Sequence, residues 1–151
     1  MSPEEELRFL VLGAQREGSR SFTNMLAPLG LTPAQAEVIS CLRAGGPMSL
    51  NELGKLLVCE TGSPSRLVDT LVGREIVARR EDPVDRRRVT LELTADGARL
   101  AAELRQVEDQ LHGWIGERLG ADTVATLVNH LRRITEGTSS GNAIARRRSQ
   151  S

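Results

Sequence analysis

Cysteine and histidine are too few and too scattered in this sequence to suggest a metal site. The chain contains two cysteines, Cys41 and Cys59, and two histidines, His112 and His130. Neither cysteine belongs to a C-x-x-C motif, and the histidines are far in sequence from the cysteines and from each other. Metal sites need several such ligands at short spacings. We therefore expect no metal and no cofactor.

Long apolar runs and catalytic motifs are also missing. No stretch resembles a signal peptide, and no apolar run is long enough to cross a bilayer. We therefore expect a cytoplasmic protein that contacts no membrane. The sequence has no H-E-x-x-H motif and no phosphate-binding glycine loop. Because an enzyme needs its reactive groups in a defined frame, we expect no enzymatic activity.

The chain lacks a net charge of either sign. Lys and Arg together number 20, and so do Asp and Glu. Many nucleic-acid binders carry a basic surplus, so any binding to nucleic acid must come from a local concentration of charge. Lys55 is the single lysine. Arginine suits forked contacts to phosphate or carboxylate, although a GC-rich coding sequence would give the same excess.

Three helix-start signals occur in the first third of the chain. The segments Ser2 to Glu5, Thr32 to Gln35 and Ser49 to Glu52 each begin with a hydroxyl residue and have Glu or Gln three positions later. Apolar residues follow each signal at helical spacing. We expect a long first helix that ends near Gly30, a second helix that ends at Gly45, and a short third helix.

A fourth helix start, Ser63-Pro64, follows the short third helix. A short helix, a tight connection and a second helix form the helix-turn-helix pattern, although an ordinary helical hairpin has the same pattern. Two starts remain open: either Ser63 caps the helix, or the helix begins near Glu60 with Pro64 in its first turn. The apolar stripe of this helix contains Leu67, Val68, Leu71 and Val72.

The next stretch changes to the alternating pattern of strands. Residues 76–80 and 88–93 are predicted to be strands, and residues 82–85 a turn. Between Arg79 and Arg88 the chain has five arginines but only three carboxylates, a local surplus of two positive charges. A helix-turn-helix followed by such a hairpin is a winged helix.

The segment from Leu31 to Gly97 resembles the MarR family of bacterial transcription regulators. The residues that match the family's wing motif are Arg79, Asp82-Pro83, Asp85-Arg86-Arg87, Leu93-Thr94 and Gly97. The resemblance spans nearly the full chain, because the family also has long helices before and after this segment. It implies an obligate homodimer, with recognition helices in adjacent major-groove segments of double-stranded DNA and wings in the flanking minor grooves.

The resemblance also implies a function: a transcription regulator, in most members a repressor, that binds a pseudo-palindromic operator. A winged helix that contacts only proteins is the alternative. A small-molecule effector is implied between the helical region and the winged lobe, but with Phe9, Phe22 and Trp114 as the only aromatic residues its identity stays unknown. The residues placed at DNA are Ser63, Ser65, Arg66, Asp85, Arg86 and Arg87.

Two details of the site follow from these positions. We expect Arg87 to reach a minor groove, with Asp85 accepting a hydrogen bond from its guanidinium; otherwise Asp85 is only a turn residue. Cys59 lies just before the recognition helix, so it is either a thiol sensor or, as such cysteines more often are, a small packing residue.

The fold class predicted is mainly α with a small β-hairpin wing. We expect residues 1–30 and 95–136 to form a helical dimerisation region, residues 31–94 a winged helix-turn-helix lobe, and residues 137–151 a mobile polar and basic tail. The apolar stripes of the long helices exceed what the lobe can cover, which favours a partner chain over a monomeric bundle. The last stripe contains Val124, Leu127, Val128, Leu131 and Ile134.

Overall fold

The structure, a computed structural model, describes residues 1–59 and 62–150. In these residues it has seven α-helices, one 3-10 helix and one antiparallel pair of strands. The elements in chain order are α1 (Pro3–Leu26), η1 (Ala27–Leu29), α2 (Pro33–Gly45), α3 (Leu50–Gly54), α4 (Pro64–Gly73), β1 (Val77–Glu81), β2 (Val89–Leu93), α5 (Ala95–Leu119), α6 (Ala121–Thr135) and α7 (Ser139–Arg148).

The first three helices begin where the sequence predicted. The hydroxyl groups of Ser2, Thr32 and Ser49 each accept the backbone N–H of the residue three positions later, at 3.2 Å. Gln35 and Glu52 return their side chains to the N–H of the capping residue, which completes two capping boxes. Each box satisfies backbone donors that a helix start leaves unpaired.

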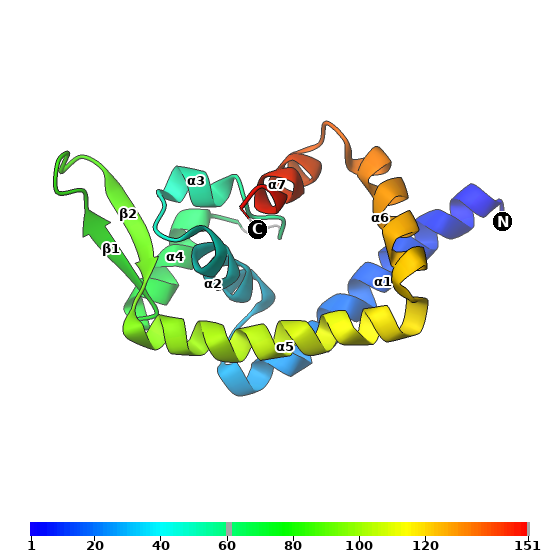
Figure 1. Cartoon of the computed structure of the whole chain (residues 1–151), viewed down its shortest axis with the longest axis horizontal. Helices are drawn as coiled ribbons and strands as arrows, with labels where there is room; N and C mark the ends of the chain where they lie inside the picture. The colour runs from blue at the N-terminus through cyan, green and yellow to red at the C-terminus, as the bar shows by residue number, and fades with distance from the viewer. Residues whose placement is uncertain (60–61, 151) are drawn as a thin grey trace.

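Helix α2 lies at the centre of the core (Figure 1). Its residues 36–42 are all buried, and α1, α4, α5 and β2 pack against it. Because α2 is enclosed, its polar residues need partners inside the protein. Ile39 of α2 packs among fully buried leucines from the surrounding elements, and together they complete the core: Leu26, Leu53, Leu71, Leu91 and Leu104.

The predicted hairpin is present. Val77 pairs with Leu93 at its base, and Glu81 pairs with Val89 near its tip. Leu91 also exchanges two backbone hydrogen bonds with Met48, at 2.7 and 3.1 Å, a contact that no sequence pattern indicated. The hairpin is therefore fixed to the lobe at its base, while its tip projects into solvent (Figure 1).

A polar cluster joins α5 to α2. Glu108 of α5 accepts a hydrogen bond from the Ser40 hydroxyl and forms an ion pair with Arg43 at 2.7 Å. Arg43 also donates to the carbonyl of Ala101 at 3.1 Å. Because these groups are partly buried, the pair is less screened than one at the surface. The cluster holds the long helix α5 against the winged lobe.

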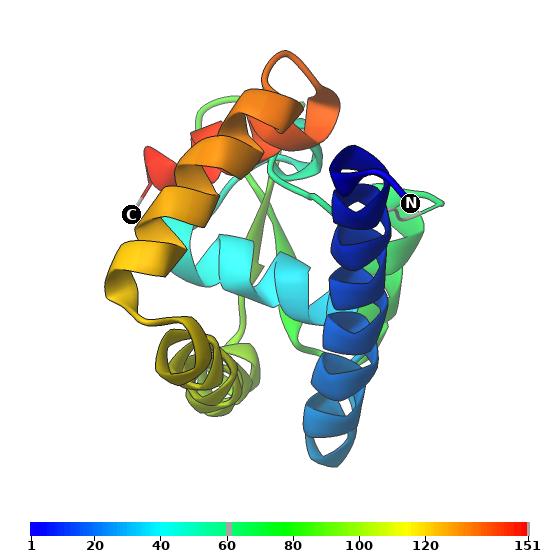
Figure 2. The same ribbon diagram turned by 90° about the vertical axis from the view of Figure 1, so that its right-hand side faces the viewer.

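The outer halves of α1 and α5, together with α6, extend away from the hairpin (Figures 1 and 2). This mainly helical fold with a two-stranded wing and long terminal helices confirms the predicted fold class. The extensions carry large apolar side chains that the chain leaves exposed: Leu7, Phe9, Leu10, Val11, Leu12, Trp114, Leu119, Leu127, Val128, Leu131 and Ile134.

The C-terminal segment differs from the prediction of a mobile tail over residues 137–151. It contains helix α7, which the Thr138 hydroxyl caps. Ala143 is buried, and Arg147 forms an ion pair with Glu37 at 2.7 Å. The sequence pattern did not predict this helix because it has no apolar stripe. A long-range ion pair and one small buried residue hold it in place instead.

No single helix in the described residues is both long and apolar enough to cross a membrane. Among the described residues, one pair of consecutive helical segments, Pro3–Leu29 and Pro33–Gly45, is long and apolar enough when taken together. The chain bends by 74° between these two segments.

Gly97, in the first turn of α5, packs directly against the backbone of Ile76. A Cβ atom at Gly97 would lie 2.0 Å from the carbonyl oxygen of Ile76, so Gly97→Ala forces the backbone to shift. We expect it to lower the free energy of unfolding by about 2 kcal/mol or more. Gly113→Ala, on the same helix with no neighbour within 4 Å of the new Cβ, should raise it by up to about 1 kcal/mol. Urea denaturation followed by circular dichroism measures both; equal midpoints for Gly97→Ala and the wild type would contradict this packing.

Candidate nucleic-acid interface

The N-terminal end of α4 is exposed beside the hairpin. The Ser63 hydroxyl caps the helix by accepting the N–H of Arg66 at 3.4 Å, and Pro64 occupies the first position. This is the late start of the two that the sequence left open; Glu60, named in the other, and Thr61 lie outside the described residues. Ser65 and Arg66 are exposed and Ser63 is half-buried.

Two opposite faces of α4 fix its position. Val68 and Leu71 are fully buried in the core. On the outer face, Asp69 accepts a hydrogen bond from Arg79 of β1 at 2.5 Å. Exposed pairs of this kind add little stability, but this one joins the helix directly to the hairpin. The helix and the hairpin are therefore in direct contact through these two side chains.

Two aspartates build the turn at the hairpin tip. Asp82 Oδ1 accepts the N–H groups of Val84 at 2.8 Å and Asp85 at 3.1 Å, and these hydrogen bonds lower the pKa of Asp82. Asp85 Oδ1 accepts the N–H of Arg87 at 3.0 Å. Aspartates that bond the backbone two residues on stabilise tight turns. The carboxylates of the loop therefore set its shape.

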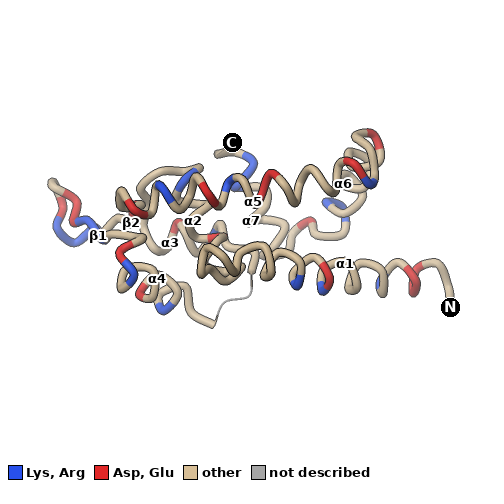
Figure 3. The backbone as a smooth tube through the Cα atoms, turned by 90° about the horizontal axis from the view of Figure 1, so that it is seen from below, with Lys and Arg blue, Asp and Glu red and all other residues tan. Residues whose placement is uncertain are grey.

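The expected contact between Asp85 and the Arg87 guanidinium is wrong. The carboxylate bonds the backbone N–H of Arg87 instead, as the turn-residue alternative required. Within residues 1–59 and 62–150, Arg86 and Arg87 form no ion pair, and both are exposed. Arg79 and Arg80, nearer the base, are paired with carboxylates. Figure 3 shows that basic and acidic positions both lie along the backbone of the hairpin.

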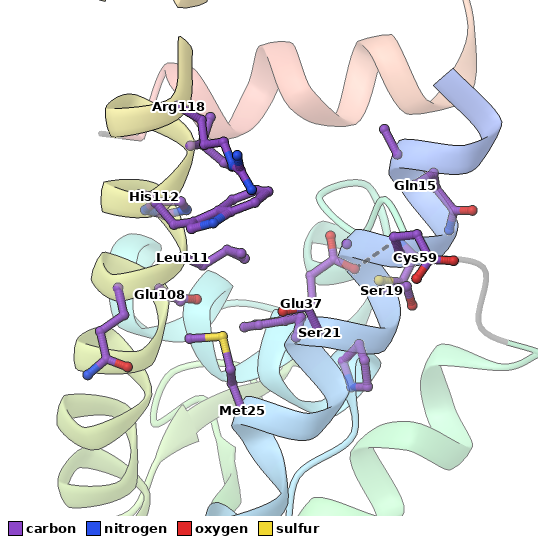
Figure 4. Close-up of a pocket in the computed structure, with 18 of the residues that line it drawn as sticks. Gln15, Ser19, Ser21, Met25, Glu37, Cys59, Glu108, Leu111, His112 and Arg118 are labelled. Carbon is purple, nitrogen blue, oxygen red and sulfur yellow. Dashed lines mark hydrogen bonds between the residues drawn. The ribbon is translucent and has the colours of Figure 1, made fainter. Parts of the chain in front are cut away.

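A cavity of about 1160 Å³ lies between α1 and α5 (Figure 4). Its polar lining residues include Glu37, Cys59 and Arg147. The sequence indicated no aromatic pocket, because the side chains that meet here come from distant parts of the chain. The apolar wall includes Phe22, Met25, Leu111, Trp114 and Ile115.

Cys59 lines this cavity next to Glu37 (Figure 4). The Cys59 N–H donates to Glu37 Oε2 at 2.8 Å. Although part of the residue is exposed, burial of the thiol and the neighbouring Glu37 carboxylate raise the pKa of Cys59 to about 12. Since peroxides react with the thiolate, this environment favours the packing role over the sensor role.

One catalytic pattern escaped the sequence reasoning. Residues 137–141 read G-x-S-x-G, which in hydrolases places a nucleophilic serine on a strand-to-helix turn. Here the segment follows α6 and its last three residues begin α7, so the serine stands on no strand-to-helix turn. In the described residues, no group of three His, Cys, Asp or Glu side chains could hold a metal ion.

Comparison with known proteins agrees with this geometry. A model of the MarR family matches residues 31–89. The multiple antibiotic resistance protein MarR of Salmonella typhimurium is 33% identical over 126 residues, which are 83% of this chain and 88% of the relative. The chain belongs to the MarR family. It is a DNA-binding transcription regulator with a winged helix-turn-helix and not an enzyme, as the sequence predicted.

Solved structures of MarR proteins share the fold. A cysteine-to-serine variant of MarR from Escherichia coli, in complex with operator DNA, matches with a TM-score of 0.75 at 32% identity, over 85% of this chain and 93% of the other. BpsR of Bordetella bronchiseptica, whose DNA binding is regulated by 6-hydroxynicotinic acid, matches with a TM-score of 0.75 at 26% identity, over 87% and 99%. The repressor NicR of Pseudomonas putida is 31% identical over 121 residues, 76% of this chain and 77% of NicR.

The raised pKa of Cys59 predicts a slow thiol. At pH 8, iodoacetamide should modify Cys59 at least about tenfold more slowly than it modifies free cysteine, because little thiolate is present. DNA binding by the wild type and by Cys59→Ser should be equal, before and after peroxide treatment. Mass spectrometry of the modified peptides and a gel-shift assay measure the two effects. Loss of binding after peroxide in the wild type alone would restore the sensor hypothesis.

Proposed function

We propose that this MarR protein is a repressor that binds a pseudo-palindromic operator as a homodimer and responds to a small molecule. The observation that carries the proposal is the exposed start of α4 beside a wing whose Arg86 and Arg87 form no ion pair in the described residues. The likeness to an operator-bound MarR structure and to a repressor supports it. Such a protein acts where bacterial DNA is, in the cytoplasm.

The start of α4 is the proposed reader of base edges. Ser63, Ser65 and Arg66 occupy the first turn, which is the part of a recognition helix that enters the major groove. Serine hydroxyls and a guanidinium offer hydrogen bonds to bases and phosphates. The buried side of the helix holds this turn at a fixed height above the lobe, so a bound duplex meets a preformed surface.

The wing is the proposed minor-groove contact. Arg86 and Arg87 supply positive charge at its tip, and the narrow minor groove of A·T-rich DNA concentrates negative potential. Asp85 belongs to this site as the residue that shapes the turn through the Arg87 N–H. Since the chain has no net charge, this local surplus supplies the attraction to DNA.

The exposed apolar side chains of α1 and α6 are the proposed contact between two copies. In the single chain, Leu127, Val128 and Leu131 are about 40% exposed, and Ile134 is 64% exposed. Monomeric proteins rarely expose so many large apolar residues on one face. A symmetric pair would bury them and would place two copies of α4 on one side of the dimer. Residues 1–30 and 95–136 would then serve pairing, and residues 31–94 DNA binding.

The cavity between α1 and α5 is the proposed effector site. Ligand sites of proteins are concave and mostly apolar with a few polar groups, as this cavity is. It adjoins both the helices of the pairing region and Glu37 of the winged lobe. A molecule that binds one spacing of these parts better than another would shift the distance between the two recognition helices. The regulation of BpsR by 6-hydroxynicotinic acid supports this response.

Selection of bound fragments from the source genome tests the function as a whole. Repeated recovery of a few fragments that share an inverted repeat is the expected result, and the adjacent genes would suggest the effector. A protein-only module would recover fragments at random, and its weak binding to DNA would not respond specifically to sequence.

Substitution of Leu131 by Asp tests the pairing surface. An aspartate there would be buried without a partner in the dimer, so we expect monomeric protein that has lost DNA binding. Asn129→Asp adds the same charge two residues earlier, on the opposite side of α6, and should leave a dimer that binds normally. Sedimentation velocity gives the oligomeric state, and fluorescence anisotropy gives the affinity. A dimeric Leu131→Asp variant with full affinity would overturn the placement of the interface.

Variants of the wing tip separate charge from turn geometry. Arg87→Ala should weaken DNA binding by about 1–3 kcal/mol and reduce its salt dependence. Asp85→Ala should also weaken binding, although it removes a negative charge, because the Arg87 N–H loses its acceptor. Asp85→Asn keeps an acceptor oxygen and should bind at least as tightly as the wild type.

Anisotropy titrations at several salt concentrations, with each variant confirmed folded, measure these effects. If Asp85→Ala binds more tightly than the wild type, the carboxylate only repels phosphate and its role in the turn is excluded.

A further inference from the structure

Helix α7 returns from the far end of the molecule to the winged lobe (Figures 1 and 2). Gln150, just beyond α7, lies beside the end of α2: a Cβ atom on Gly45 would meet its side-chain oxygen at 3.2 Å. Ala143, in the middle of α7, is buried. The last helix therefore connects α6, which carries the proposed pairing surface, with the helix at the centre of the core.

Arg147 makes the long-range ion pair of α7. Its Nη1 donates to Glu37 Oε1 at 2.7 Å, and only 8% of the Glu37 side chain is exposed. The same carboxylate accepts the backbone N–H groups of Val58 and Cys59, each at 2.8 Å. A buried carboxylate is tolerated when its charge is countered and its oxygens are hydrogen-bonded. Arg147 provides the opposite charge, and the two N–H groups provide the other bonds.

Val58 and Cys59 belong to the connection between α3 and α4. They lie outside any helix or strand, so their N–H groups have no partner from regular structure. Glu37 therefore anchors this connection to α2. Ser63, the cap of α4, is the fourth residue after Cys59, so a fixed Cys59 limits how far the start of α4 can move. An ion pair on the surface would add little stability, but Arg147 pairs with a carboxylate that is almost fully buried and orients it.

We propose that Arg147 is a positioning residue for DNA binding: through Glu37 it fixes the Val58–Cys59 connection, and with it the start of α4. Arg147 acts without touching DNA. The inference rests on the proposed function in one respect, that α4 reads the operator. It assigns the C-terminal helix a role in the reading surface, although that helix lies outside the segment that the family model matches.

The test compares Arg147→Ala with Arg146→Ala, which removes an exposed arginine from the neighbouring position of the same helix. Hydrogen exchange in the full-length protein without DNA reports the Val58 and Cys59 amides directly. Anisotropy on a duplex selected from a random pool with the wild-type protein reports affinity and its salt dependence. Circular dichroism melts confirm that each variant is folded.

We expect Arg147→Ala to exchange the two amides about tenfold faster and to bind the duplex about tenfold more weakly, with the salt dependence unchanged. Arg146→Ala should leave the exchange as in the wild type, and Arg147→Lys should restore most of the protection. In a Glu37→Gln background, which already weakens the anchor, Arg147→Ala should add little.

Two results would overturn the inference. Unchanged amide exchange in Arg147→Ala would show that the ion pair does not hold the connection. Faster exchange with an affinity equal to that of the wild type, on a duplex that Arg87→Ala binds more weakly, would show that the connection does not position the DNA-binding surface. Failure of the proposed function looks different: faster exchange would persist in Arg147→Ala, while Arg87→Ala would bind the duplex as the wild type does.

Discussion

The enclosure of α2 is the constraint on which the rest of the structure depends. Residues 36–42 are buried on every side, yet Glu37 and Ser40 among them are polar. Each therefore needs a partner from another element, and these partners fix the neighbours. Ser40 and Arg43 bind Glu108 and so hold α5 against α2. Glu37 binds the backbone of Val58 and Cys59, which precede α4, and it binds Arg147 of α7. Contacts with α2 thus fix the positions of the elements that are proposed to bind DNA and to form the dimer.

Charge acts locally in this protein because the chain as a whole is neutral. Most carboxylates near the arginine-rich hairpin bind groups of the protein itself. Asp69 pairs with Arg79 and Glu92 with Arg80. Asp82 and Asp85 accept hydrogen bonds from backbone N–H groups of the turn. These interactions leave Arg86 and Arg87 exposed at the tip, which is the proposed contact with the minor groove. The mixture of charges therefore builds a rigid support beneath two exposed cations.

Local rules explain what the sequence predicted well. Capping residues, apolar spacing and turn residues act over a few positions, and they located α1 to α5 and the hairpin. The α7 helix and the Glu37 anchor were missed because Arg147 and Glu37 meet only in the folded chain. The partner of Asp85 was also misjudged: the sequence shows that a carboxylate and an arginine are close, but not whether the backbone or the guanidinium donates. The resemblance implied an effector site between the helical region and the winged lobe, but not the side chains that line the cavity, because α1 and α5 come together only in the folded chain.

Hydroxyl-radical footprinting of a selected genomic fragment tests the central claim, a symmetric dimer that reads DNA with α4 and the wing, most directly. The account predicts a two-fold symmetric pattern, with the two half-sites about 10 base pairs apart or a multiple of this, and protection of the flanking minor grooves. Loss of only the flanking protection in Arg87→Ala would assign it to the wing. A single asymmetric footprint, or protection that is the same on any sequence, would contradict the account.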